Sequence, residues 1–230
     1  MEVEVETRAT LDELGIKHNT DKATITRNQD GSERRAHNYL AFYEQFFAPL
    51  RDEKITLLEL GVGPDWRSGA SLYTFREYFP QAQIIGADIR QSAIAAQSER
   101  IRIEIGDLGE AAFLDRLRRI RPAILIDDAS HFWHHQVQAL CGLWSSVQKG
   151  GYYVVEDVHT SFGRFREEGK HSGDQPFTAY RFLQVIAEAQ QDPTLEFPDI
   201  PAAELEMARA IARQSVFIAF ARHTVLLKKR

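Results

Sequence analysis

The sequence predicts an α/β protein whose sheet has five parallel strands followed by an antiparallel pair. From Ile55 to Asp157, short apolar runs alternate with longer amphipathic runs, a pattern typical of strands joined by crossover helices. Near the C-terminus, S-V-F-I-A-F-A-R and T-V-L-L-K-K are separated by only about two residues, which fits a hairpin and leaves no room for a helix. The 230 residues are 43% hydrophobic, enough for one large domain with a buried core.

The predicted elements follow one another in the order that such a sheet requires. The first fifty residues contain the helical stretches L-D-E-L-G-I and H-N-Y-L-A-F-Y-E-Q-F-F, and we expect a helical cap at 1–50. The parallel strands are predicted at 55–60, 82–88, 101–105, 123–127 and 152–157, and the helices between them at 70–79, 111–120 and 132–147.

The segment after the fifth strand lacks any clear hydrophobic period. Residues 158–177 contain three glycines and a proline, so we expect a long loop there, followed by a helix near 178–189. Loops of more than about 12–15 residues are usually functional or disordered, and we interpret this one as a lid over the site. Residues 1–230 are therefore predicted to form a single domain with a cap, a core at 55–157 and this lid.

Charge and composition exclude several classes of protein. The formal net charge is −5, whereas nucleic-acid-binding proteins usually carry a basic excess. Cys141 is the single cysteine, so no internal disulfide forms, as expected in a reducing compartment. The N-terminus, M-E-V-E-V-E-T-R, is acidic, and no apolar run reaches the ~20 residues that span a bilayer. We expect a cytoplasmic protein that binds neither nucleic acid nor membranes; a homo-oligomer stays open.

Every predicted parallel strand ends in one or two carboxylates. In an open α/β sheet, ligands bind in the crevice beyond the carboxyl ends of the strands. A single acid in such a place can simply cap a helix, and for Asp107 this reading is as good as a functional one. Five strand ends in succession point to one acidic site. The residues are Glu59, Asp88, Asp107, Asp127 with Asp128, and Glu156 with Asp157.

The first glycine-bearing turn indicates which ligand this crevice accepts. The turn reads G-V-G-P-D-W, without the third glycine of a dinucleotide fingerprint and without a P-loop lysine, so pyrophosphate binding is disfavoured. A ligand with a ribose and no phosphate fits better. Asp88 is expected to accept the ribose hydroxyls and Asp107 the adenine amine, while Glu59, Gly61 and one of the paired aspartates hold an amino-acid portion. That ligand is S-adenosyl-L-methionine.

These residues carry a resemblance to class I S-adenosylmethionine-dependent methyltransferases. More narrowly, the chain resembles metal-dependent sugar O-methyltransferases of antibiotic biosynthesis, of the mycinamicin 2''-O-methyltransferase type. The matching stretches are N-T-D-K with H-N-Y, L-L-E-L-G-V-G, G-A-S-L, G-A-D-I, I-G-D, I-D-D-A-S-H and V-E-D-V-H-T. The resemblance implies a Rossmann-like sheet with strand order 3-2-1-4-5-7-6. It also implies that Lys22 and Tyr39 help to cover the cofactor, and it adds Ser71, in G-A-S-L, to the cofactor site.

By the same resemblance, the adjacent residues Asp127 and Asp128 bind different positive charges, the amine of the cofactor and a metal ion. Asp127 faces the amine of the cofactor's methionine part, while Asp128, Glu156 and Asp157 are implied to be metal ligands. Three carboxylates with water and hydroxyl oxygens form a hard-oxygen shell, which suits Mg²⁺. His131 then serves as the general base that removes a proton from an acceptor hydroxyl.

The acceptor is expected to be a small-molecule glycoside or polyol that presents neighbouring hydroxyls to the metal. His135 and His159 are further candidates for the site. Three other functions stay open: a catechol-type aromatic O-methyltransferase, a cephalosporin-hydroxylase-like protein, and a catalytically inactive module that keeps the cofactor site. The intact set of acids with His131 argues against the last of these, because such a module has no need to hold several costly charges together.

Overall fold

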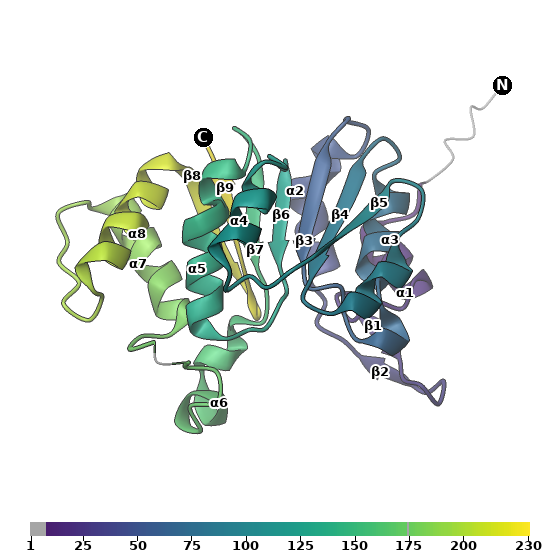
Figure 1. Ribbon diagram of the computed structural model, residues 1–230, viewed down its shortest axis with the longest axis horizontal. Helices are drawn as coiled ribbons and strands as arrows, with labels where there is room; N and C mark the ends of the chain where they lie inside the picture. The colour runs from purple at the N-terminus through teal and green to yellow at the C-terminus, as the bar shows by residue number, and fades with distance from the viewer. Residues whose placement is uncertain (1–7, 174) are drawn as a thin grey trace.

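A seven-stranded sheet forms the centre of the protein. The computed structural model describes residues 8–173 and 175–230. The strands lie in the order β5-β4-β3-β6-β7-β9-β8, with β5, β4, β3, β6 and β7 parallel and β9 and β8 antiparallel (Figure 1). Their bounds are β3 Thr56–Leu60, β4 Gln83–Asp88, β5 Ile101–Ile105, β6 Ile124–Asp127, β7 Tyr152–Val155, β8 Ser215–Ala221 and β9 Thr224–Lys229. The predicted fold class, strand order and hairpin are confirmed.

Helices cover both faces of the sheet (Figure 1). Successive side chains of a strand point to opposite faces, so Leu57 packs in the core with α1, α2 and α3, while Leu58 packs in the core with α4, α5, α7 and α8. The helices are α1 Leu11–Lys17, α2 Leu40–Phe47, α3 Ala70–Tyr78, α4 Ala111–Arg118, α5 Trp133–Leu143, α6 Gly163–Glu167, α7 Ala179–Gln191 and α8 Ala202–Gln214. Short 3₁₀ helices are η1 Ala48–Leu50, η2 Asp65–Arg67, η3 Gln91–Ala96, η4 Trp144–Ser146 and η5 Val158–Ser161.

Local sequence explains where several helices begin. Before α1, the Thr10 hydroxyl accepts the Glu13 N–H at 3.2 Å, and the Glu13 carboxylate accepts the Thr10 N–H at 2.7 Å, which is a capping box. Before α7, the Thr178 hydroxyl accepts the Arg181 N–H at 3.0 Å. No helix in the described ranges is both long and apolar enough to cross a membrane.

The structure adds elements that the sequence analysis did not predict. The N-terminal cap contains the antiparallel hairpin of β1 Ile25–Arg27 and β2 Glu33–Arg35. These strands have three residues each, and β2 is fully exposed, so they carry no apolar alternation to recognise. The segment predicted as a loop begins with η5 and α6. Helix α8 was overlooked, although its buried residues recur at helical spacing.

Two stretches lie outside the described residues. The acidic N-terminal residues 1–7 belong to the predicted cap, and residue 174 belongs to the predicted lid.

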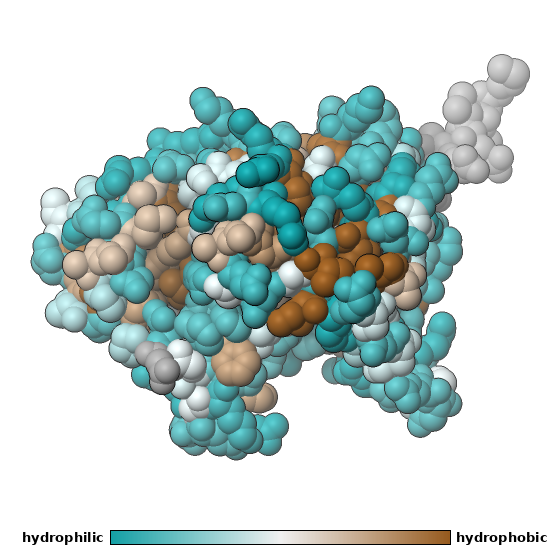
Figure 2. Space-filling view, in the orientation of Figure 1, coloured by the Kyte–Doolittle hydropathy of each residue, from teal (hydrophilic) through white to brown (hydrophobic). Residues whose placement is uncertain are grey.

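Figure 2 shows that hydrophilic residues dominate one face of the molecule, with a hydrophobic patch on the side of β4 and β5. Ile89 and Ile94, which follow β4, are 64% and 43% exposed. This side of the molecule therefore offers an apolar surface beside the strand ends.

Candidate active site

A cavity of about 460 Å³ opens beyond the carboxyl ends of the parallel strands. The loops after β3, β4, β5, β6 and β7 contribute to its wall, and the N-terminal cap closes another side with Thr20, Asp21 and Lys22. This is the place where an open α/β sheet binds its ligands. The predicted site residues that line it are Lys22, Gly61, Ser71, Asp88, Asp107, Asp128, His131 and Asp157. Tyr39, Glu59, Asp127 and Glu156 are buried and do not line it.

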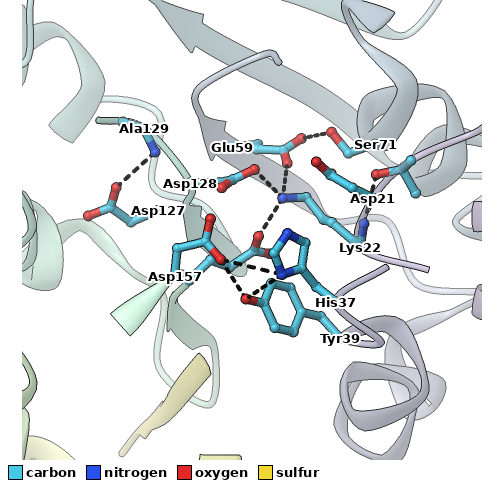
Figure 3. A network of polar contacts seen from close by, with 12 residues as sticks. Asp21, Lys22, His37, Tyr39, Glu59, Ser71, Asp127, Asp128, Ala129 and Asp157 are labelled. Carbon is cyan, nitrogen blue, oxygen red and sulfur yellow. Dashed lines mark hydrogen bonds and ion pairs between the residues drawn. The ribbon is translucent and has the colours of Figure 1, made fainter. Parts of the chain in front are cut away.

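A buried lysine joins the N-terminal cap to the strand-end acids (Figure 3). The Lys22 side chain is 2% exposed, and its Nζ lies 2.5 Å from Oε2 of Glu156 and 3.2 Å from Oε1 of Glu59. It also donates to Oδ2 of Asp128. A buried ammonium is stable only when charged partners surround it. The lysine expected to cover the cofactor thus lies among the carboxylates.

The charged groups of this network shift one another's pKa values. Burial alone would lower the pKa of Lys22, but the negative charges of Asp128, Glu156 and Glu59 raise it above its usual value, so Lys22 stays protonated. Burial raises the pKa of Glu59 to about 7, against the opposing effect of Lys22. Burial likewise raises the pKa of Asp128 and of Glu156. Lys22 is therefore the main counter-charge that opposes the effect of burial on the pKa values of these acids.

Glu156 has both carboxylate oxygens engaged inside the protein. Oε2 contacts Lys22, and Oε1 accepts the hydroxyl of Tyr43 at 2.8 Å. The Tyr43 hydroxyl also lies 3.1 Å from Oγ1 of Thr224 on β9. In this arrangement both carboxylate oxygens of Glu156 bind side chains in the protein interior, and Glu156 is not among the residues that line the cavity.

Imidazole and phenol groups surround Asp157, the other acid after β7. The Tyr39 hydroxyl donates to Oδ1 of Asp157 at 2.6 Å, and Nε2 of His131 lies 3.4 Å from Oδ2. His159 and His37 lie 3.6 Å and 3.8 Å from Oδ1. Burial alone would raise the pKa of Asp157, but His131 and Tyr39 hold it below the usual value. Asp157 is thus ionised and well positioned at neutral pH.

Asp128, His131 and Asp157 form a group that could hold a metal ion. One ligand atom from each lies within 4.8 Å of the other two. His131 and Asp157 both have a left-handed backbone, with φ of 57° and 53°. Non-glycine residues rarely adopt this conformation, and it concentrates at functional sites. The two carboxylates of this group suit a hard divalent cation, and the imidazole lies beside them.

The first glycine turn positions Asp88 at the second strand end. A Cβ on Gly61 would lie 2.2 Å from the carbonyl oxygen of Asp128, so this close approach needs glycine. The Val62 N–H donates to Oδ2 of Asp88 at 2.9 Å, and the Arg90 guanidinium lies 2.9 Å from the same atom. Burial would raise the pKa of Asp88, but these hydrogen bonds hold it below its ordinary value.

The remaining predicted cofactor residues make mostly local contacts. Ser71 donates to Oε2 of Glu59 at 2.6 Å. Asp107 accepts the Gly109 N–H at 2.8 Å, as a capping residue does, while its side chain also borders the cavity. Asp127 points away from Asp128, and in the part of the chain that the structure describes its carboxylate accepts one long hydrogen bond, from the Ala129 N–H at 3.4 Å (Figure 3). Its burial raises its pKa to about 7.

Several site residues were missed by the sequence analysis. Asp21 borders the cavity and pairs with Arg67, and Arg90 pairs with Asp88. His37 contacts Asp157 from the cap. Asp21 and His37 belong to the stretches N-T-D-K and H-N-Y, which had been noted as matching motifs, so that signal was present. The contacts of Arg67 and Arg90 depend on turns whose geometry the sequence alone does not give.

His135 and His159, the further histidine candidates, both lie at the site. His135 borders the cavity, and its Nδ1 lies 2.6 Å from the Ser130 hydroxyl. His159 lies beside Asp157 and contacts His223 at a tilted angle, with ring centroids 4.8 Å apart. Burial lowers the pKa of both histidines, so both favour the neutral imidazole.

Comparison with known proteins places these residues in context. The chain is 36% identical over 154 residues to 8-demethyl-8-alpha-L-rhamnosyl tetracenomycin-C 2'-O-methyltransferase of Streptomyces olivaceus, covering 65% of this chain and 38% of that protein. It is 38% identical over 132 residues to mycinamicin VI 2''-O-methyltransferase of Micromonospora griseorubida, covering 55% and 33%. The chain thus spans less than two-fifths of the length of these curated relatives. No family model matches the chain.

A solved structure shares the whole fold. The MycE methyltransferase of the mycinamycin biosynthetic pathway, in complex with Mg, SAH and mycinamycin VI, superposes with a TM-score of 0.77 at 26% identity, over 97% of this chain and 55% of that one. The chain therefore has a class I methyltransferase fold and is related in sequence to sugar O-methyltransferases of antibiotic pathways. The resemblance predicted from the motifs is confirmed.

Proposed function

We propose that this chain is an S-adenosylmethionine- and Mg²⁺-dependent O-methyltransferase that methylates a sugar hydroxyl of a natural-product glycoside. One observation carries the proposal: Asp128, Asp157 and His131 converge at the edge of a cavity whose far wall holds Asp88. One cavity thus contains both a cluster of acids suited to a metal ion and an acid suited to the hydroxyls of a ribose. The solved MycE complex contains Mg and SAH together, which supports the same pairing of ligands here.

The proposed donor site extends from the first glycine turn to the end of β5. Asp88 lies at the second strand end, where an acid can accept ribose hydroxyls. Ile89 and Leu108 add apolar surface to the same wall, which suits an adenine ring. Gly61 lets the amino-acid part approach the backbone, and Lys22, Tyr39, Glu59, Ser71, Asp107 and Asp127 remain the other proposed residues of the donor site. The donor, when bound, supplies an electrophilic methyl group.

Asp128, Glu156 and Asp157 are the proposed metal ligands. A divalent cation held there lowers the pKa of a coordinated hydroxyl. Asp128 and Asp157 already border the cavity, whereas Glu156 must release Lys22 or Tyr43 before an oxygen can turn outward. We therefore expect removal of Asp128 or Asp157 to weaken Mg²⁺ binding more than removal of Glu156.

His131 is the proposed general base. Its Nε2 faces Asp157 at 3.4 Å, on the cavity side of the metal-type group. An acceptor hydroxyl placed beside Asp128 and Asp157 lies within reach of this nitrogen, which can take the proton during methyl transfer. Asp157 in turn orients the imidazole and stabilises its charged form. Positioning of the hydroxyl by the same residues supplies a further part of the rate.

The segment 158–177 is the proposed lid over the acceptor. It starts at the strand that carries Asp157, and its far end is tied to the start of α5, because the Trp133 N–H donates to the His171 carbonyl at 2.8 Å. Phe165 packs edge-on against His159 at 5.3 Å. The segment thus begins beside Asp157 and packs against His159, which puts its residues in a position to contact a bound glycoside.

Other acceptors and functions are less well supported. Two relatives carry a sugar position in their names, 2' and 2'', which favours a glycoside over a catechol. A module that only binds the cofactor does not account for the ordered His131–Asp157 pair. We propose small-molecule partners only and a cytoplasmic location, which the single cysteine of the chain supports.

Metal dependence tests the proposal directly. Mg²⁺ titration by calorimetry in the presence of SAH is expected to show one site in the wild type and a strongly weakened site in Asp128→Asn. Asp115→Asn is the matched control, because Asp115 is 58% exposed and pairs with Arg118 on its own helix, α4. Equal Mg²⁺ binding by wild type and Asp128→Asn contradicts the proposal, as does full methyl transfer after complete removal of divalent ions.

A further inference from the structure

Strand β8 is an open edge of the main sheet. It pairs with β9 on one side, and no strand of the described ranges 8–173 and 175–230 lies on the other (Figure 1). In an antiparallel pair, alternate residues face the partner strand, so every second residue of β8 presents its N–H and C=O outward. Apart from the ladder with β9, no hydrogen bond reaches the backbone of residues 216–221 from any part of the chain that the structure describes.

The residues of β8 do not protect this edge. The strand reads S-V-F-I-A-F-A, seven residues without a charge or a proline. Monomeric proteins usually block exposed edges with lysine, proline, very short strands or bulges. Here a register irregularity is confined to Ser215–Phe217, which leaves 217–221 regular. Val216 and Phe220 are 51% and 38% exposed.

Aromatic side chains extend the apolar surface on both sides of the edge. On one face of the sheet, Phe217 lies 5.6 Å from Phe46 of α2, measured between ring centroids. On the other face, Phe220 lies 5.5 Å from Tyr180, which lies 4.7 Å from Phe162. Phe162 is itself 49% exposed. Aromatic residues are enriched at protein interfaces, and exposed apolar surface of this kind marks a contact site.

We propose that β8 is a homodimer interface, in which β8 of one copy pairs antiparallel with β8 of a second copy about a twofold axis at Ala219. In this register Ile218 lies opposite Phe220 of the second copy, and Phe217 lies opposite Ala221. Aromatic residues opposite branched aliphatic ones stabilise antiparallel pairs. The two seven-stranded sheets then form one continuous sheet.

We identify the partner as a second copy of this chain because the side chains of β8 are complementary to those of an antiparallel β8. In the twofold arrangement, the large side chain of Phe217 lies opposite the small one of Ala221, and Ile218 lies opposite Phe220. The two small Ala219 side chains meet at the twofold axis. Arg222 falls opposite Val216, so no like charges face each other across the pair. A standard interface takes roughly 20–30 residues from each partner, more than one strand supplies, and the aromatic residues on both faces extend the contact. Among the residues that the structure describes, none after 157 lines the cavity, so the β8 edge lies apart from the proposed donor and metal sites.

Molar mass in solution tests the interface. Light scattering coupled to size-exclusion chromatography is expected to give the wild type twice the 26.3 kDa of one chain. Phe220→Lys places a charge in the contact and is expected to halve the mass, with an unchanged far-ultraviolet circular dichroism spectrum at 25 °C. Ile94→Lys is the matched control: Ile94 is 43% exposed on η3, beside the opposite edge of the sheet, and this variant stays dimeric. A monomeric wild type, or a Phe220→Lys protein that remains dimeric, overturns the proposal.

A cross-link tests the register. Ala219→Cys in a Cys141→Ser background places one thiol per chain at the proposed axis. Opposite residues of an antiparallel pair have Cα atoms about 4.5–5.5 Å apart, which suits a disulfide. Oxidation with diamide, which accepts the two electrons, is expected to give a covalent dimer that a reductant reverses. Ile94→Cys in the same background stays uncross-linked. A protein that is dimeric by mass and gives no cross-link from Ala219→Cys overturns the β8 pairing.

Discussion

Replacing Lys22 with methionine tests whether the lysine holds the strand-end acids together. Methionine keeps the apolar stem and removes the ammonium, so Lys22→Met leaves Glu59, Asp128 and Glu156 without their shared counter-charge. Removing one partner of a buried ion pair costs about 3–5 kcal/mol. For a chain of this size, each kcal/mol lowers the melting temperature by about 2–4 °C. The expected loss is therefore about 6–20 °C.

The loss should depend on pH in a definite direction. The pKa of Glu59 is raised to about 7 in the folded protein, from an ordinary 4.5. A raised acid pKa favours folding below the ordinary value, and this contribution is lost as pH rises through the folded value. Without Lys22 the pKa of Glu59 rises further. The difference between wild type and Lys22→Met should thus be small at acid pH and grow between about 4.5 and above 7.

Thermal melting by circular dichroism, with EDTA present to exclude divalent ions, measures this difference. Lys17→Met is the matched control, because Lys17 pairs with Glu77 at 2.6 Å but is 60% exposed. Exposed pairs contribute about 0–1 kcal/mol. The interpretation is refuted if Lys22→Met melts like Lys17→Met, or if its loss of stability is the same at pH 5 and pH 8, values that bracket the folded pKa of Glu59 at about 7.

Three further predictions concern the donor, the base and the lid. The lowered pKa of Asp88 stabilises the fold above its ordinary value of 3.8, and this contribution is lost as the pH falls below it, so Asp88→Asn should make the melting temperature less dependent on pH in acid. The same variant should lose most of the about 2.7 kcal/mol of stability that a hundredfold excess of donor adds, and an unchanged donor-induced shift in melting temperature would exclude Asp88 from the donor site. His131→Ala should bind SAH and Mg²⁺ normally and turn over about 10²–10⁴ times more slowly; near-normal turnover would assign the base to another group. Replacing 162–173 with a Gly-Ser linker should leave donor affinity intact and lower kcat/KM for the acceptor, and unchanged acceptor kinetics would contradict the lid.

The sheet and its acidic edge were predictable because both depend on local pattern. Each parallel strand is a short, largely apolar run with a carboxylate at its end or within two residues of it, as in I-L-I-D before Asp128. The parallel order then brings these ends to one edge. Asp88, Asp128 and Asp157 accordingly border the same cavity.

The location of Lys22 was not predictable in the same way. Its contact with Glu156 joins residues 134 positions apart, and no local period encodes such a pairing. The engagement of Glu156 by Tyr43 depends in the same way on how α2 packs against β7 and β9. The β1–β2 hairpin was missed for a different reason, because its short polar strands carry no hydrophobic alternation.

The central claim is that this cavity brings an activated methyl group and a sugar hydroxyl together beside Asp128, Asp157 and His131. The most direct measurement incubates the protein with S-adenosylmethionine carrying a labelled methyl group, Mg²⁺, and a panel of natural-product glycosides, with their aglycones and a catechol as comparisons. Mass spectrometry then locates the label.

The account predicts that a glycoside gains one labelled methyl group on a sugar oxygen, that EDTA prevents this, and that His131→Ala slows it. The aglycones and the catechol stay unlabelled. Label on the catechol alone, or equal labelling of the glycosides with and without divalent ions, would contradict the claim.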